Sequence, residues 1–185
     1  MANGKFTLTM LASILILITI ALLLLLFSMV WPPDSPWSPW WRTSKKIARL
    51  QCTLARIDKN DVIYDLGSGD GTALITAAKE FGAKGVGIEI DPFRLWYSRI
   101  AAYFSGVSQQ VAFDRKNFFD TEIKDATVVF MYLIPKALNR LKPKLLKELK
   151  PGTRIVTFVY RIDLPLVASD LKHEVYVYKV PAKKT

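Results

Sequence analysis

The hydrophobic pattern divides the chain into one long apolar run and a longer segment of short alternating patterns. Residues 8–30 carry no charged side chain, and their only polar members are Thr9, Ser13, Thr19 and Ser28. As a helix this run would measure roughly 35 Å, enough to cross a hydrocarbon core of about 30 Å. The apolar part of a cleavable signal peptide is shorter, roughly 7–15 residues. The pattern therefore predicts one uncleaved N-terminal transmembrane helix.

The flanks of the apolar run predict its orientation. Only Lys5 precedes it, whereas four basic residues and one acid, Asp34, follow it within the next twenty or so positions: Arg42, Lys45, Lys46 and Arg49. The positive-inside tendency then places the rest of the chain on the cytoplasmic side, or on the matrix side in a mitochondrion. We expect a single-pass membrane protein.

Tryptophan and proline crowd the segment after the run. Four of the five tryptophans lie there, at Trp31, Trp37, Trp40 and Trp41. Such a segment suits an interfacial aromatic belt, with prolines making a stiff spacer. We therefore expect three parts: a tail and membrane anchor over 1–30, a Trp/Pro-rich linker over 31–42, and a folded domain over 43–185.

Within residues 43–185, short apolar runs alternate with segments of helical period. Strands are predicted at Val62–Leu66, Gly85–Ile90, Gln110–Phe113, Thr127–Met131, Arg154–Tyr160 and Glu174–Val180. Helices are predicted at 45–57 with Thr43 or Ser44 as N-cap, at Thr72–Phe81, at Phe93–Phe104 after Asp91-Pro92, and at Pro135–Leu149, which Pro143 should kink or divide. This alternation predicts an α/β domain with a Rossmann-like, doubly wound, mostly parallel sheet, whose ligands bind beyond the carboxyl ends of the strands.

Composition narrows the chemistry. The chain has 26 Lys and Arg against 16 Asp and Glu, a formal charge of +10, which favours anionic surfaces without choosing among lipid, nucleic acid and acidic protein. Cys52 is the single cysteine and His173 the single histidine. An intrachain disulfide and a His/Cys metal cluster are therefore excluded, and no metal site is predicted.

The stretch VIYDLGSGDG, residues 62–71, is the strongest candidate for a binding loop. Alternate glycines allow a sharp turn and a close approach of bare backbone to a ligand. Thr72 stands where a dinucleotide fingerprint needs its last glycine, and a phosphate loop would need a lysine that is absent. The carboxylates of Asp65 and Asp70 favour a ligand that carries positive charge, although Asp70 is equally explained by turn chemistry.

The next strand ends in VGIEID, which places Glu89 where a carboxylate can accept both hydroxyls of a ribose. An adenosine without phosphates fits both features. For Asp91 we prefer helix capping.

An acid and three glycines after the first strand, with an acid ending the second, resemble the class I S-adenosylmethionine-dependent methyltransferases. The resemblance implies that Asp65 and the loop backbone face the methionine moiety of S-adenosyl-L-methionine, and that Glu89 binds the ribose. It also implies that Ile90 packs on the adenine, and that Asn117 and Phe118 stand where the family often has an acid near the adenine amino group. The cofactor-binding residues that it implies are Asp65, Gly67, Ser68, Gly69, Asp70, Gly71, Glu89, Ile90, Asn117 and Phe118.

A narrower resemblance is carried by YDLGSGDG, GVGIEIDP, VVFMYLIP and LKPKLLKELKPGTRIV. These segments are similar to the small archaeal and mitochondrial protein lysine methyltransferases, the type that includes the ATP synthase c-subunit lysine methyltransferase. Thr43 matches a threonine that this group has in a short motif before the leading helix. The resemblance implies direct in-line methyl transfer to a deprotonated lysine amine of a protein, which the anchor would place at a membrane, where the substrate itself could be embedded.

Missing residues disfavour nucleic-acid bases as acceptors. The adenine amino-methyltransferases resemble one another in a [DN]-P-P-[YF] tetrad, which residues 131–135 lack, and Cys52 lies upstream of the loop rather than beyond it. Tyr132 either lines the acceptor slot or is a packed aromatic. A lipid or quinone methyltransferase at the membrane and a non-catalytic binding module remain alternatives, the latter using the basic run between Lys136 and Arg154.

Overall fold

The computed structural model describes residues 2–30 and 41–182, with residues 2–8, 25 and 27–30 described by their backbone alone. The chain divides into two compact units, Met1–Trp40 and Trp41–Thr185. Most of the predicted linker, with Trp31, Trp37 and Trp40 of the predicted aromatic belt, lies outside the described residues.

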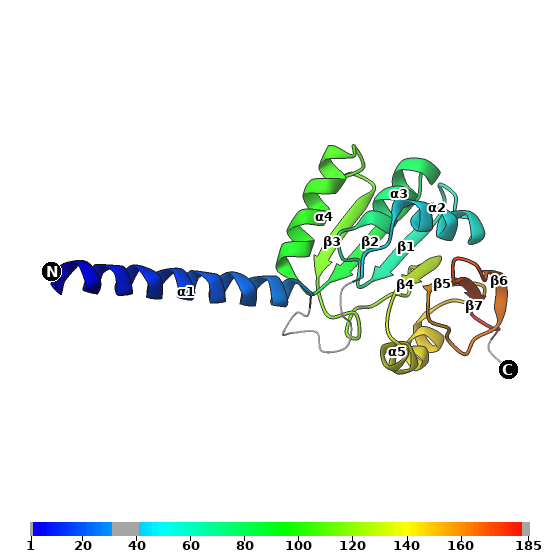
Figure 1. Cartoon of the computed structure of the whole chain (residues 1–185). Helices are drawn as coiled ribbons and strands as arrows, with labels where there is room; N and C mark the ends of the chain where they lie inside the picture. Colours follow the sequence, from blue (N-terminus) through cyan, green and yellow to red (C-terminus); the bar gives the residue numbers. More distant parts are fainter. Residues whose placement is uncertain (1, 31–40, 183–185) are drawn as a thin grey trace. The chain divides into compact units, whose positions relative to one another are not determined.

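The first unit contains the helix α1, Ala2–Val30 (Figure 1). Its described side chains from Thr9 to Leu24 are exposed, and most of them are apolar. Within the part of the chain that the structure describes, no helix has both the length and the hydropathy needed to cross a membrane.

The second unit is built on a seven-stranded sheet with the order β3-β2-β1-β4-β5-β7-β6. The first five strands run parallel to one another, and β7 is antiparallel to both of its neighbours. The strands are β1 (Val62–Leu66), β2 (Lys84–Glu89), β3 (Val111–Arg115), β4 (Val128–Met131), β5 (Arg154–Phe158), β6 (Leu166–Asp170) and β7 (Val175–Lys179). The predicted Rossmann-like, mostly parallel sheet is confirmed.

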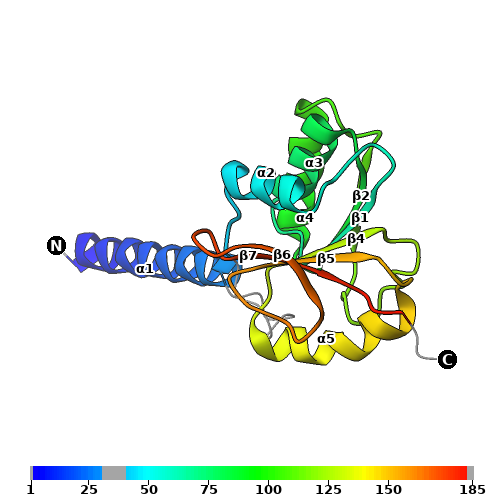
Figure 2. The same cartoon turned by 90° about the vertical axis from the view of Figure 1, so that its right-hand side faces the viewer.

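Helices cover both faces of the sheet (Figure 2). On one face lie α2 (Lys45–Leu54), α3 (Thr72–Phe81) and α4 (Pro92–Phe104), and on the other lies α5 (Pro135–Glu148). Each face has its own buried apolar cluster, the first including Leu74 and Phe113, the second Ile88 and Leu141. The connections from β3 to β4 and from β5 to β6 contain no helix.

Local sequence signals set the ends of these helices. Ser44 is the N-cap of α2 and accepts from the backbone N–H of Ile47 at 3.3 Å. The carboxylate of Asp91 accepts from two backbone N–H groups of the first turn of α4, and Pro92 follows it, as predicted. The helix α3 ends at Gly82, whose φ of 73° suits a left-handed C-terminal residue.

Two predictions about elements were wrong. Pro143 does not divide its segment, because α5 runs as one helix from Pro135 to Glu148 with Pro143 inside it, and the alternative of a kink stays a prediction. The predicted helix over 45–57 ends at Leu54, after which Arg56 takes a positive φ of 52°. The strand β6 was not predicted. It lies at the sheet edge and mostly in solvent, so its sequence shows no buried alternation.

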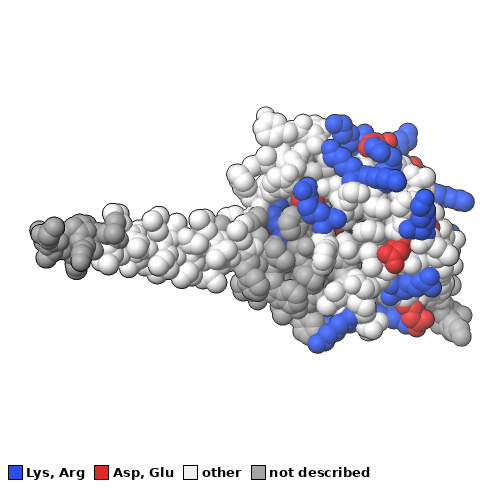
Figure 3. Space-filling view, viewed as in Figure 1, with Lys and Arg blue, Asp and Glu red and all other residues white. Residues whose placement is uncertain are grey.

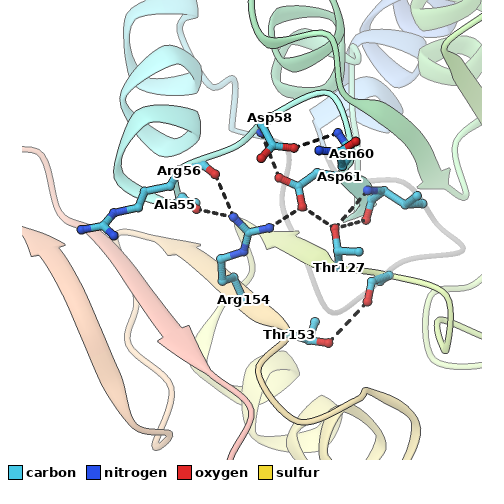
Figure 4. Close-up of polar contacts among 10 residues, drawn as sticks. Ala55, Arg56, Asp58, Asn60, Asp61, Thr127, Thr153 and Arg154 are labelled. Carbon is cyan, nitrogen blue, oxygen red and sulfur yellow. Dashed lines mark hydrogen bonds and ion pairs between the residues drawn. The ribbon is translucent and has the colours of Figure 1, made fainter.

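A polar network fastens the amino-terminal ends of the central strands (Figure 4). One carboxylate oxygen of Asp61 accepts from Thr127 Oγ1 at 2.6 Å and also pairs with Arg154. The same guanidinium donates to the carbonyls of Ala55 at 2.7 Å and Arg56 at 2.9 Å. Arg154 therefore joins the end of α2 to the start of β5, on the side of the sheet away from the glycine loop.

Candidate functional site

The carboxyl ends of β1, β2 and β4 meet at one edge of the sheet, and the glycine loop lies there. In the sheet register, Leu66 at the end of β1 stands beside Ile88 on one side and Met131 on the other. The loop 67–71 therefore lies between Glu89 of β2 and Tyr132, which follows β4. In a parallel α/β sheet this edge is where ligands bind.

The loop needs glycine for both conformation and space. Gly67, Gly69 and Gly71 have positive φ angles of 88°, 55° and 76°. A Cβ atom on Gly71 would lie 2.7 Å from the ring of Phe113, closer than real side chains approach. The turn therefore requires glycine at these positions.

Glu89 holds the loop in shape. Its Oε2 accepts from the N–H of Gly69 at 2.9 Å, and its Oε1 accepts from the N–H of Asp91 at 2.9 Å. The side chain is buried, and burial raises the pKa of Glu89 above its ordinary value. Each carboxylate oxygen keeps a further lone pair, so both could also accept from the hydroxyls of a ribose.

Asp65 is a buried acid beside two others. Burial chiefly, and then the negative charges of Glu89 and Asp70, raise the pKa of Asp65 to about 7. An acid in this setting is stabilised in its ionised form by a cation, so the three carboxylates suit a ligand that carries an ammonium or sulfonium group.

Asp70 has the turn role that the sequence offered for it and an ion pair besides, and its contact with a ligand stays a prediction. Its Oδ1 accepts from the N–H of Thr72 at 3.1 Å, which begins α3, and its Oδ2 lies 2.9 Å from Nε of Arg42. The pair connects the segment before α2 to the glycine loop. It also brings the half-buried Thr43 toward this edge, as the residue after Arg42. Arg42 was not predicted as a site residue, because its partner is distant in sequence.

The residues expected near an adenine occupy the edge of β2 and the turn after β3. Ile90 is half-buried, and its carbonyl accepts from Arg115 Nε at 3.2 Å. The Oδ1 of Asn117 accepts from the N–H of Phe119 at 3.0 Å, so this oxygen is used within its own turn. Phe118 is buried in the same apolar cluster as α5. Their expected contacts with an adenine stay predictions.

Tyr132 has aromatic and acidic neighbours that the sequence did not reveal. Its ring lies 4.6 Å from the ring of Phe158, centroid to centroid. Burial raises the pKa of the Tyr132 phenol, and the nearby Tyr160 and Glu174 raise it further. Gly67 lies near Leu133, the residue after Tyr132, because a Cβ on Gly67 would be 3.4 Å from the Leu133 side chain. The segment that carries Tyr132 therefore runs beside the start of the glycine loop.

A strained turn positions Tyr160. Val159 has a φ of 66°, which is rare for a β-branched residue. The N–H of Tyr160 donates to the carbonyl of Phe158 at 2.8 Å, closing a three-residue γ-turn around Val159. The N–H of Val159 donates to the carbonyl of Glu174 at 2.8 Å, which ties the turn to the start of β7. The sequence reads here as a continuing strand, so no local signal marks the turn.

The described residues contain no group of three or more His, Cys, Asp or Glu side chains placed to hold a metal ion. The candidate site consists of three carboxylates, a glycine loop and an aromatic cluster.

Comparison with known proteins identifies similar families, sequences and structures. The ANTKMT methyltransferase domain family matches residues 65–165. A protein-lysine N-methyltransferase of Saccharolobus islandicus is 37% identical over 164 residues, 84% of this chain and 100% of the relative. An ATP synthase c-subunit lysine N-methyltransferase of Xenopus laevis is 33% identical, but the match covers 53% of this chain and 43% of that protein. The chain thus spans less than half of this vertebrate relative.

The structure of an RNA methyltransferase from Salinibacter ruber, solved in complex with S-adenosyl-L-homocysteine, superposes with a TM-score of 0.74. It is 38% identical and covers 78% of this chain and 97% of that one. The family match runs from Asp65 to Pro165 and so includes the glycine loop and Glu89, and the three carboxylates suit the positive charge of S-adenosyl-L-methionine. The chain therefore belongs to the ANTKMT methyltransferase domain family and is an S-adenosylmethionine-dependent methyltransferase.

Proposed function

We propose that this enzyme methylates the side-chain amine of a lysine in a protein. The observation that carries the proposal is the aromatic and acidic cluster of Tyr132, Phe158, Tyr160 and Glu174, beside the glycine loop. Aromatic faces attract a lysine ammonium, and a nearby carboxylate adds to that attraction. The relatives support a lysine acceptor, since an archaeal and several animal proteins among them are named as protein lysine methyltransferases.

The cofactor roles follow the geometry of the three carboxylates. Asp65 and the backbone of 67–71, with Ser68 among them, would face the methionine moiety, and Asp65 would become ionised against its positive charge. Glu89 would accept from the ribose hydroxyls while it keeps the N–H of Gly69. Ile90, Asn117 and Phe118 would border the adenine. Thr43, carried to the loop by the pair of Arg42 with Asp70, would close the methionine end.

The acceptor amine has to lose its proton before it attacks. At pH 7 this costs about 4–5 kcal/mol for an ordinary lysine, whose pKa is near 10.4. Phe158 and Tyr132 partly desolvate the slot, which disfavours the ammonium form and lowers that cost. When bound, S-adenosyl-L-methionine supplies an electrophilic methyl group. The chain's own contribution is to align the amine with that group, the main requirement for in-line displacement.

Membrane anchoring through residues 8–30 is part of the proposal. It is supported by the absence of charge in that run and by the continuous helix α1. The folded unit would then lie on the cytoplasmic or matrix side, and tethering would raise the effective concentration of a membrane-bound or membrane-embedded substrate. The basic excess of the chain suits such a surface, and Figure 3 shows Lys and Arg outnumbering Asp and Glu on the visible face.

A methyl-transfer assay tests the acceptor class. Full-length protein is incubated with methyl-labelled S-adenosyl-L-methionine and membranes from its own source, and the protein, lipid and RNA fractions are counted separately. We expect label in protein, recovered as methyllysine and lost with Glu89→Ala. Label confined to lipid would favour a lipid or quinone methyltransferase. Label confined to RNA would favour the activity for which the Salinibacter ruber protein is named, and either result would contradict the lysine proposal.

A substitution in the slot tests the acceptor site separately from the cofactor site. We expect Tyr160→Ala to lower transfer to protein by roughly tenfold to a hundredfold, because the amine loses a positioning contact. Calorimetric binding of S-adenosyl-L-methionine should stay unchanged, because Tyr160 lies beyond the glycine loop. Leu171→Ala, at an exposed position outside the slot, serves as the matched control. Equal activity of the two variants would show that Tyr160 does not position the acceptor amine.

A further inference from the structure

The outward face of α4 is a continuous aromatic stripe. Phe93, Trp96, Tyr97, Tyr103 and Phe104 are 60%, 65%, 51%, 71% and 83% exposed. Their positions recur at helical spacing, with the half-buried Ile100 between them, so they share one face. The opposite face of α4 is buried through Leu95, Ser98 and Ala102.

Among the described residues, this stripe belongs to neither of the two buried apolar clusters. The exposed rings of Tyr103 and Phe104 contact each other edge to face at 5.6 Å, and the core uses only the other side of the helix. In Figure 3 the surface at the position of α4 is mostly white, whereas Lys and Arg gather elsewhere on that face. A contiguous exposed apolar surface on a folded unit commonly marks an interaction site.

The chemistry of the stripe fits one occupant, the interfacial layer of a membrane. Trp and Tyr have an apolar body and a polar tip, which suits the boundary between headgroups and acyl chains. The helix α4 contains no acidic residue that anionic headgroups would repel. A second copy or a soluble partner would more usually offer polar groups around an aromatic centre.

The length of the linker permits this contact. Residues 31–40 join the uncharged run 8–30 to the folded unit, and ten residues reach at most about 36 Å. A folded unit tethered so closely cannot move far from a bilayer that holds the run. We propose that α4 lies on the membrane surface with Phe93, Trp96, Tyr97, Tyr103 and Phe104 inserted at the interface. The proposal rests on the anchoring put forward above.

The contact would also orient the active site. The helix α4 begins two residues after Ile90, so its first turn borders the residues assigned to the adenosine. A helix lying in the interface would hold this edge of the sheet at headgroup level. A lysine close to the membrane surface would then be within reach of the slot.

Fluorescence quenching by brominated lipids tests the proposal. In the full chain, Trp31, Trp37, Trp40 and Trp41 are replaced by Phe, which leaves Trp96 as the single tryptophan. The protein is reconstituted in phosphatidylcholine vesicles with a minority of phosphatidylglycerol, with and without bromine on the acyl chains. An interfacial helix buries its apolar face about 5–10 Å deep, so we expect Trp96 to lose about half of its emission or more.

A matched control places the fluorophore elsewhere. Trp96→Phe with Leu171→Trp, in the same background, puts the single tryptophan at an exposed position on the turn between β6 and β7. We expect its emission to be unchanged by bromine. Calorimetric binding of S-adenosyl-L-methionine confirms that both variants are folded.

Three outcomes would overturn the proposal. Equal quenching of the two tryptophans would show that α4 does not lie closer to the membrane than the turn between β6 and β7. A blue-shifted but unquenched Trp96 in a particle of twice the protein mass would assign the stripe to a second copy. Failure of the protein to float with the vesicles would overturn the anchor and the α4 contact together. Methyl transfer measured on the same samples reports the lysine proposal independently of all three.

Discussion

The buried carboxyl of Asp65 lowers the stability of the fold near neutral pH, at a position where we propose that it binds the cofactor. Its carboxyl is buried beside Glu89 and Asp70, and its pKa of about 7 lies well above the 3.8 of an unperturbed aspartate. The folded state therefore holds a proton that the unfolded state releases. Stability contributed by this group is highest below about pH 4, falls as the pH rises toward 7, and is lost above it.

The substitution Asp65→Asn removes this penalty. We expect its melting temperature at pH 8 to exceed that of the wild type, since each 1 kcal/mol shifts the midpoint by about 2–4 °C. The gain should shrink toward pH 5, and S-adenosyl-L-methionine should bind more weakly. Thermal unfolding and calorimetric titration at both pH values measure these effects. Asp163→Asn, at an exposed ion pair with Lys142, is the control and should give no gain.

Val159 has a strained backbone conformation at the proposed acceptor slot. A positive φ costs a β-branched residue on the order of 1–3 kcal/mol, whereas glycine adopts it freely. We expect Val159→Gly to leave the free energy of unfolding unchanged or higher, and to reduce methyl transfer because Tyr160 is held less firmly. Urea unfolding and kcat measure the two effects. Val167→Gly in the edge strand should destabilise instead, and a similar loss in both variants would argue against strain.

At the scale of elements, α5 tolerates a proline in its interior. Pro143 cannot donate to the carbonyl of Asn139, yet the buried side chains of Leu138, Leu141 and Leu145 keep the helix continuous. We expect Pro143→Ala to raise the free energy of unfolding by about 1–3 kcal/mol. Pro135→Ala is the control, because proline in the first turn costs nothing there. Chemical denaturation compares the two variants. Equal free energies of unfolding would show that Pro143 does not destabilise α5.

Elements with their own caps and glycines were predictable from the sequence. Asp91-Pro92 and the alternate glycines marked α4 and the binding loop because the deciding contacts are local. The strand β6 was not found, since it lies in solvent at the edge. The predicted division at Pro143 was wrong because packing against the sheet overrides the local preference.

The residues of the candidate site likewise differ in whether the sequence could predict them. Asp65 and Glu89 could be placed because each ends a strand whose position the pattern fixes. Tyr160 and Glu174 could not, because they come together only through the antiparallel pairing of β5 with β7. Arg42 joins the loop through a contact between residues that are distant in the sequence.

For the whole molecule, the lysine proposal predicts how the rate depends on pH. The fraction of unprotonated amine rises tenfold for each unit of pH below the acceptor's pKa, near 10.4 for a free lysine. We expect kcat at saturating cofactor to rise along that slope and to level off below pH 10.4 if the slot lowers the pKa. Separately, KM for S-adenosyl-L-methionine should fall as the pH passes about 7, where Asp65 ionises. A flat profile of kcat from pH 6 to 9 would contradict a protonated amine as the starting state.

The helix-free connections after β3 and β5 have a consequence for substrate choice. Among the described residues, neither connection places a helix beside the proposed slot at Tyr132 and Tyr160. If the acceptor is a protein, as proposed, we expect its own surface to help exclude water from the slot. Such an enzyme selects by the surroundings of a lysine rather than by a sequence motif. We therefore expect a lysine on a rigid surface to be methylated faster than the same residue on a flexible chain, which would leave the slot open to water.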